Sequence, residues 1–324
     1  MDNIKSARTK TLFPLAKAMD FTADVAPNGY VWWYVDALSD DGESGLTIIA
    51  FIGSVFSPYY ASARRRGLAD PENHVALNVA LYGKGGKRWA MTERGRQALS
   101  RTHFSWKAGP SGISIDRDGL SIEIDEWTVP RPSRLRGHVR VTPLVQTQET
   151  FALDAAGRHV WSPLAPRCRV DVEMDAPSRR WQGEGYLDRN RGERPLEVDF
   201  SYWDWSCMSV GDHRAILYDV IRRDGSEQSL GLLVDQAGEV KQIDLPPRVT
   251  LAPNSWRVPR RTQSLDSAQI LKTFEDTPFY SRSLIQTRIL DESVSGMHES
   301  LSLDRFKSRV VQSMLPFRMP RRSW

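Results

Sequence analysis

Apolar residues fall in short runs along most of this chain, some continuous and some alternating with polar residues, and turn signals such as residues 39–42 and 83–86 separate these runs. A period of two is typical of β-strands, and short strands at such spacing indicate an antiparallel sandwich or barrel. We also expect 169–174 to pair with 181–187. Strands are predicted at residues 30–35, 46–56, 75–82, 88–92, 112–115, 120–124, 137–142, 169–174, 181–187, 215–222 and 230–234.

Two segments depart from this pattern, residues 57–66 and 265–275, and both are predicted to be short helices. Strands and helices do not alternate as in a nucleotide-binding fold, so we predict an all-β protein. A chain of 324 residues suggests two domains at about 150 residues each. We place the boundary after the loop that holds Pro195, giving domains 1–199 and 200–324.

Composition and charge argue against several classes of protein. The net charge of +4 is small for the length, and no zinc-finger or RNP pattern accompanies it, so nucleic acid is not an expected partner. Two cysteines, Cys168 and Cys207, form no disulfide framework and fit a reducing cytoplasm. The N-terminal 19 residues make a poor signal peptide, and the longest apolar run, 46–56, is too short to span a bilayer.

No segment of the sequence matches a known metal-binding or cofactor-binding motif in full. Residues 83–87 resemble a phosphate loop, but Arg88 stands where Ser or Thr should bind magnesium. The six histidines lack the spacing of a zinc site, and no GxSxG elbow occurs. Asp188 begins a run like a calcium loop, but Gly192 and Asp199 occupy ligand positions. We therefore expect no metal site and no cofactor.

Eleven tryptophans leave two interpretations open, core packing or the lining of a site for a large apolar ligand. Two pairs of residues point to chemistry. On strands, Tyr186 and Asp188 share one face, as do His159 and Trp161, so the four side chains could converge. The alternative is a turn-capping aspartate beside two packing aromatics.

At these residues the sequence resembles the carotenoid 1,2-hydratases, or hydroxyneurosporene synthases, of photosynthetic bacteria. The resemblance covers nearly the whole chain. It rests on long blocks such as GYVWWYVDALSDDGESG, FALDAAGRHVWSPLAP, GEGYLDRNRGERPLEVDF and MHESLSLDRFKSRVVQSMLPF.

This resemblance implies a fold of two lipocalin-like β-barrel or sandwich domains, shared with a wider group that includes cofactor-free pericyclases. It also implies acyclic carotenoids such as neurosporene and lycopene as substrates, together with water. The family's catalytic His and Trp (HxW) and Tyr and Asp (GYxD) correspond to His159, Trp161, Tyr186 and Asp188.

The chemistry of hydration fits these residue types. Protonation of the terminal alkene at C2 gives a tertiary cation at C1, which water captures. A carboxyl group in an apolar pocket has a raised pKa and stays protonated, so Asp188 is assigned as the acid. Trp161 and Tyr186 would stabilise the cation. His159 could orient the water, accept its proton or hold Asp188 protonated.

A second group of residues is expected to bind substrate. Asp36 shares a strand face with Trp32 and Tyr34 and is an alternative acid, and Trp203 lies in the WDWS block. Asp40 and Asp41 fit an ordinary solvated turn.

Because carotenoids reside in membranes, we expect a cytoplasmic protein that contacts the inner or photosynthetic membrane peripherally. Arg64–Arg66 and the tail 318–324, with Trp324, could provide that contact, or they could be ordinary solvated charge. Two other functions remain open: a non-catalytic carotenoid or lipid carrier, and a cofactor-free isomerase or cyclase on the same scaffold.

Overall fold

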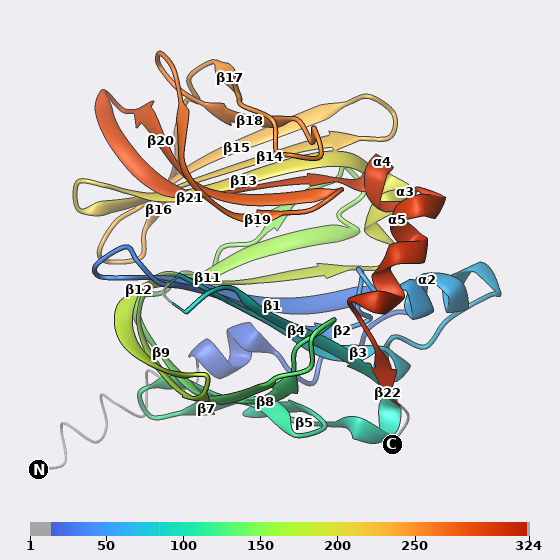
Figure 1. The fold of residues 1–324 in the computed structure, drawn as a ribbon. Coiled ribbons are helices and arrows are strands. Elements are labelled where there is room, and N and C mark those ends of the chain that lie inside the picture. Colours follow the sequence, from blue (N-terminus) through green and yellow to red (C-terminus); the bar gives the residue numbers. More distant parts are fainter. Residues whose placement is uncertain (1–13, 84, 323–324) are drawn as a thin grey trace, which may run out of the picture. The chain divides into compact units, whose positions relative to one another are not determined.

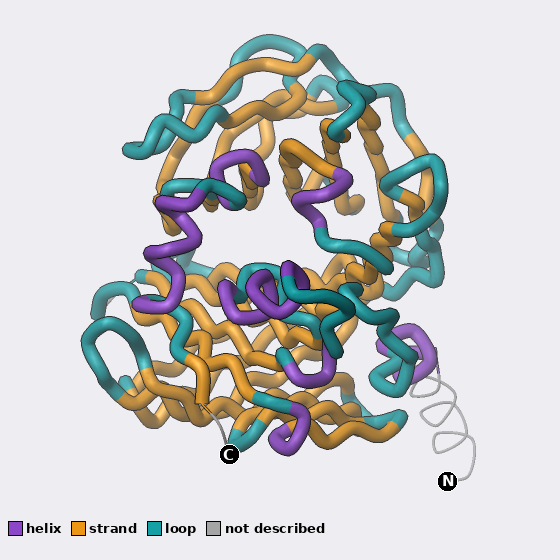
Figure 2. Tube along the Cα trace, turned by 90° about the vertical axis from the view of Figure 1, so that its right-hand side faces the viewer, coloured by secondary structure: helices purple, strands orange, loops and turns teal. Residues whose placement is uncertain are grey.

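The structure is a computed structural model, and it describes residues 14–83 and 85–322. The described residues divide into two compact units, one that runs to Pro195 and resumes at Met314, and the other of Leu196–Ser313. Strands dominate both units, and helices are confined to short segments (Figure 2). The prediction of an all-β protein is therefore confirmed. Lys84 of the predicted turn, the first 13 residues and Trp324 lie outside the described residues.

The elements of the first unit are mostly strands. Its strands are β1 (Tyr30–Ser39), β2 (Gly45–Ile52), β3 (Val75–Tyr82), β4 (Arg88–Arg94), β5 (Leu99–Thr102), β6 (Ser105–Ala108), β7 (Ser111–Asp116), β8 (Gly119–Trp127), β9 (Arg134–Val145), β10 (Phe151–Ala152), β11 (His159–Ala176), β12 (Ser178–Gly192) and β22 (Arg321–Arg322). Its helical elements are a helix that includes residues 14–19, α2 (Pro58–Arg65) and the short 3₁₀ turns η1 (Pro71–Asn73), η2 (Arg96–Ala98) and η3 (Leu315–Phe317), within the described part of the chain.

These strands form one curled sheet. Among the described residues its order is β22–β4–β3–β2–β1–β12–β11–β9–β8–β7–β6–β5, with β10 added beside β11. Figure 1 shows β7, β8 and β9 folded beneath β1–β4. The sheet curls so far that strands distant in its order come into contact: the rings of Trp33 on β1 and Trp106 on β6 lie 6.4 Å apart. The sheet thus wraps around its own hydrophobic core.

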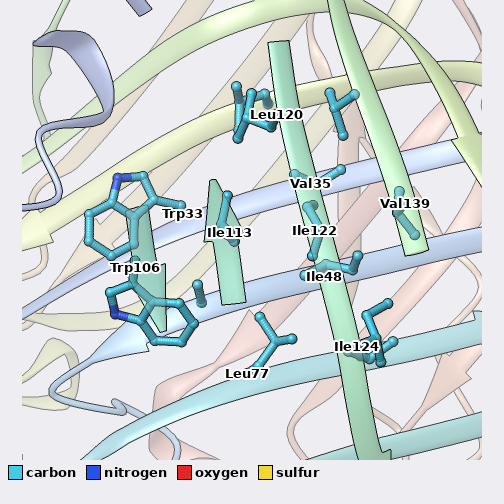
Figure 3. Close-up of a cluster of buried hydrophobic side chains, with 14 of the residues drawn as sticks. Trp33, Val35, Ile48, Leu77, Trp106, Ile113, Leu120, Ile122, Ile124 and Val139 are labelled. Atoms are coloured by element: carbon cyan, nitrogen blue, oxygen red, sulfur yellow. The ribbon is translucent and has the colours of Figure 1, made fainter. Parts of the chain in front are cut away.

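Alternate residues of each strand build that core. Trp33 and Val35 of β1 point into it, together with Ile48 of β2 and Leu77 of β3 (Figure 3). Ile122 on β8 approaches them from the opposite side. A period of two along each strand places every second side chain on the same face, so the core takes alternate residues even from β1, β2 and β3, which are almost wholly buried. The expected pairing of 169–174 with 181–187 is confirmed, with Val172 opposite Trp181.

The two predicted helices have different outcomes. The helix expected at 57–66 is α2, where Ser57 caps the backbone N–H groups of Tyr59 and Tyr60 and Pro58 occupies the first turn. The helix expected at 265–275 is wrong, because residues 269–276 form a strand of the second unit.

The second unit contains a smaller antiparallel sheet in the order β16–β15–β14–β13–β21–β20–β19, and a separate β17–β18 hairpin. None of the helices within residues 14–83 and 85–322 is long and apolar enough to cross a membrane. The elements of this unit are α3 (Leu196–Asp199), β13 (Phe200–Val210), β14 (His213–Arg222), β15 (Glu227–Val234), β16 (Val240–Gln242), β17 (Arg248–Leu251), β18 (Arg260–Gln263), β19 (Gln269–Asp276), β20 (Tyr280–Ile289), β21 (Glu292–Ser302), α4 (Leu303–Phe306) and α5 (Arg309–Met314), which ends where the chain returns to the first unit.

Candidate active site

Strand β1 is buried on both of its faces. Its odd-numbered residues, such as Trp33 and Val35, belong to the hydrophobic core. Its even-numbered residues, Trp32, Tyr34 and Asp36, lie on the other face and are 5–6% exposed. A strand buried on both sides needs no polar face, which explains the unbroken aromatic run in the sequence.

The strand register arranges the second face in rows across β1, β12 and β11. Tyr34 on β1 lies directly opposite Asp188 on β12. In the adjacent row, Trp32 on β1 and Trp161 on β11 flank Asn190 on β12. Directly opposite residues in an antiparallel sheet share a face, so these aromatic and polar side chains gather around Asp188.

Asp188 is the centre of this group. The indole Nε1 of Trp161 donates to its Oδ2 at 2.9 Å, and the hydroxyl of Tyr186 donates to the same oxygen at 3.0 Å. The amide of Asn190 lies 3.5 Å from Oδ1. Because Asp188 is only 4% exposed, its carboxyl group is held by neutral donors in a buried, largely aromatic surrounding.

His159 occupies the next row along the same face. Its side chain is fully buried, and its Nδ1 lies 2.9 Å from the hydroxyl of Tyr30 on β1. The backbone N–H of His159 donates to Asp154 at 3.0 Å. Burial would raise the pKa of Asp154, but hydrogen bonds from His159 and Arg158 hold that pKa below its usual value. Asp154 therefore anchors the start of β11 as a carboxylate.

The pairing of β11 with β12 is interrupted after Ser162, the residue that follows Trp161. The register with β12 shifts between Ser162 and Ala165, and again between Ala165 and Cys168. Pro163 and Pro166 lie in these two steps, and proline has no N–H for the ladder, so bulges form there. Before the bulges Trp161 is paired with Phe151 of β10, and its ring lies 5.5 Å from the Phe151 ring. The prolines thus separate the site from the long β9–β11 ladder.

Comparisons with known proteins bear on this arrangement. Residues 48–324 match the family model described as carotenoid hydratase CrtC. The chain belongs to the carotenoid hydratase family. It is 54% identical to the acyclic carotenoid 1,2-hydratase of Thiocapsa roseopersicina and 46% identical to that of Rubrivivax gelatinosus; each match covers 94% of this chain and 76% of the relative. The corresponding Cereibacter sphaeroides protein is 40% identical over 85% of this chain and 98% of its own.

Solved structures resemble this carotenoid hydratase family member in fold. A putative AttH from Nitrosomonas europaea has a TM-score of 0.58 at 15% identity, covering 87% of this chain and 94% of its own. Kievitone hydratase from Nectria haematococca has a TM-score of 0.53 at 9% identity, covering 89% and 95%. These matches confirm the expected lipocalin-like fold.

The other predicted site residues of this family member fall in two places. Trp32, Tyr34 and Asp36 lie on the face that carries Asp188, and Asp36 is directly opposite Tyr186. Trp203 belongs to β13 of the second unit, where its ring lies 5.7 Å from that of Tyr218. All four remain predictions as substrate-binding residues.

Sequence reasoning missed three neighbours of the site, Tyr30, Asn190 and Phe151. Tyr30 and Asn190 carry a usable signal, because each continues the period-two face of a residue already singled out: Tyr30 precedes Trp32 and Tyr34, and Asn190 follows Asp188. Phe151 carries no such signal, since only the short pairing of β10 brings it to Trp161.

Proposed function

We propose that this protein is an acyclic carotenoid 1,2-hydratase, which adds water across the terminal C1–C2 double bond by acid catalysis without a cofactor. Membership in the family supports the reaction and the substrate class. The observation that carries the mechanism is the buried carboxyl of Asp188, bonded at one oxygen by both Trp161 and Tyr186. Trp161, Tyr186 and His159 complete the proposed catalytic set.

The two hydrogen bonds decide which oxygen delivers the proton. Oδ2 of Asp188 accepts the two short hydrogen bonds from Trp161 and Tyr186, whereas Oδ1 has the longer, 3.5 Å contact with the Asn190 amide, so we assign the proton of the neutral acid to Oδ1. The alkene π-electrons take this proton to form the C2–H bond, and the O–H electron pair stays on Asp188. Hydrogen bonds to a charged acceptor are stronger than those to a neutral one, so both donors stabilise the carboxylate as it develops.

The carbocation at C1 then needs a partner that does not capture it. Tyr34 lies opposite Asp188, and its ring is 6.2 Å from the ring of Tyr186. Aromatic faces stabilise a desolvated cation by about 2 kcal/mol or more. Water adds to C1 and loses one proton, which returns to the carboxylate of Asp188 either directly or through the imidazole of His159. That transfer balances the reaction.

Isotope labelling tests the mechanism. In heavy water, the product from lycopene or neurosporene is expected to carry one deuterium on C2, and in ¹⁸O-labelled water one labelled oxygen on C1. The tertiary cation fixes this regiochemistry. Mass spectrometry and proton NMR of the product locate both labels.

The same experiment separates the competing functions. A carrier returns the carotenoid unchanged, and an isomerase can incorporate deuterium but adds no oxygen. A hydroxyl group on C2, or a product without carbon-bound deuterium at C2, would overturn protonation by the acid as the first step.

Peripheral contact with a membrane is the second part of this proposal. Two sites of the first unit combine an exposed apolar side chain with arginine. Leu68 is 83% exposed just beyond Arg65 and Arg66, and Phe317 is 77% exposed beside Arg318. Each basic residue near an anionic surface contributes about 1 kcal/mol, and each apolar side chain adds its burial in the interface.

Vesicle flotation tests the membrane contact. The Leu68→Ser/Phe317→Ser variant is expected to bind anionic vesicles about tenfold more weakly than the wild type, because two large apolar contacts are lost. Leu144→Ser is the matched control, since Leu144 is 56% exposed on β9 without being part of either site. Equal loss in the control, or equal binding of the wild type to neutral vesicles, would argue against this surface.

A further inference from the structure

Gly192 lies between two side chains of the site. It is the directly opposite partner of Tyr30 on β1 and of His159 on β11. Neighbouring strands are about 4.8 Å apart, so residues two strands apart meet only when the residue between them leaves room. Glycine leaves that room, because it has no side chain.

The space above Gly192 is filled by Tyr30 and His159. A Cβ atom at position 192 would lie 2.6 Å from His159 Nδ1 and would also collide with the Tyr30 ring. The two rings are stacked with centroids 5.9 Å apart, and the Tyr30 hydroxyl lies 2.9 Å from Nδ1. Contact between tyrosine and histidine therefore depends on glycine at this position.

Tyr30 and His159 each have a second contact that fixes their position. The Tyr30 ring stacks on Trp32 at 4.9 Å, and the backbone of His159 is bonded to Asp154. Tyr30 is 2% exposed and His159 is fully buried. A buried, doubly anchored hydrogen bond of this kind fixes the plane of an imidazole ring and selects its tautomer.

We propose that Tyr30 is the positioning residue of His159, and that it holds the neutral imidazole with its proton on Nε2. A phenol hydroxyl is a good donor and a neutral imidazole nitrogen a good acceptor, so the pair is O–H···Nδ1. His159 then acts as a hydrogen-bond donor from Nε2. Asp188 takes back the proton that the added water loses, so one carboxyl group both gives and regains a proton.

The tautomer can be measured without any substrate. Nitrogen-15 NMR of the imidazole-labelled protein is expected to show His159 with a protonated Nε2 and an unprotonated, hydrogen-bonded Nδ1. His159→Gln assigns the signal by its loss. In Tyr30→Phe the hydrogen-bond shift of Nδ1 should disappear, while the aromatic ring still packs on Trp32. A His159 with its proton on Nδ1 in the wild type would overturn the proposal.

Kinetics give the second measurement, and this part rests on the proposed function. Tyr30→Phe should lower kcat about tenfold with KM within about twofold, since one orienting hydrogen bond is lost and the apolar surface is kept. Gly192→Ala should lower kcat further, because its Cβ displaces both rings. Unchanged kcat in a folded Tyr30→Phe protein would remove Tyr30 from this role.

Tyr60→Phe is the matched control. Tyr60 is fully buried, and its hydroxyl donates to the carbonyl of Gly29 at 2.7 Å, so this variant also loses one buried tyrosine hydrogen bond near the start of β1. It should leave the His159 signal and kcat unchanged, and equal effects in both variants would mean that Tyr30 acts only through stability. If NMR shows the expected His159 tautomer but the protein hydrates no carotenoid, the proposed function is wrong and the role of Tyr30 in positioning His159 still stands.

Discussion

Asp188→Asn is expected to abolish hydration, with turnover reduced at least about a thousandfold. An amide cannot protonate an alkene, yet its oxygen can still accept the hydrogen bonds from Trp161 and Tyr186. The variant should therefore fold and bind substrate normally. Product formation from lycopene measures the loss, and near-ultraviolet circular dichroism checks that the aromatic surrounding is intact.

Asp36→Asn is the decisive companion to that experiment. Asp36 is also a buried carboxyl on β1, 5% exposed and directly opposite Tyr186. If Asp188 is the acid, the Asp36 variant should keep more than a tenth of wild-type turnover. Folded Asp188→Asn protein with that much activity, and an inactive Asp36 variant, would move the acid to Asp36.

Short apolar runs bounded by turn signals made most of the first unit predictable. The strand expected at 75–82 has the observed bounds of β3, and the strand expected at 30–35 forms the start of β1. Both strands are buried on both faces, and such a strand is a continuous apolar run in the sequence whatever its partners are. The strand order depends on partners far along the chain, as with β1 and β12, so no local pattern predicts it.

The error at 265–275 has a physical origin. The strand β19 contains register shifts between Ile270 and Lys272 and between Thr273 and Glu275. Each irregularity moves the following residues out of the period-two pattern. Ile270 and Phe274 are four residues apart, a spacing that fits one face of a strand as well as the apolar stripe of a helix, so the sequence spacing alone did not separate the two.

The site was predictable only within single strands. The period of two placed Tyr186 on the face of Asp188, and the hydrogen bond between them confirms that placement. It could not show that Trp161 donates to Asp188, because that contact joins two strands through their register. The period of two also places Tyr30 on the face of Trp32 and Tyr34, but its contact with His159, 129 residues away in the sequence, could not be predicted for the same reason. The catalytic roles themselves remain predictions.

A buried ion pair joins the two halves of the curled sheet that carries the site. Arg94 at the end of β4 binds Glu126 on β8 through two hydrogen bonds of 2.9 Å, and both side chains are at most 2% exposed. The hydroxyl of Ser111 donates to the same carboxylate at 2.8 Å. Burial raises the pKa of Glu126, while the bonds and charge of Arg94 oppose that rise.

Arg94→Met is expected to reduce the free energy of unfolding of the first unit by about 3–5 kcal/mol, because it leaves Glu126 buried without its partner. Without Arg94 the pKa of Glu126 rises further above its unfolded value. A carboxyl group with a raised folded pKa loses stability as pH increases, so the deficit should be larger at pH 8 than at pH 5. Urea unfolding followed by tryptophan fluorescence measures both effects.

The double variant Arg94→Met/Glu126→Leu separates the ion pair from simple packing. Replacement of both partners by apolar residues removes the uncompensated charge, so most of the lost stability should return and its dependence on pH should flatten. A single-variant loss below about 1 kcal/mol, the size of an exposed ion pair, would contradict the expectation. A double variant no more stable than Arg94→Met would instead assign the loss to packing around Arg94, and not to the charge of Glu126.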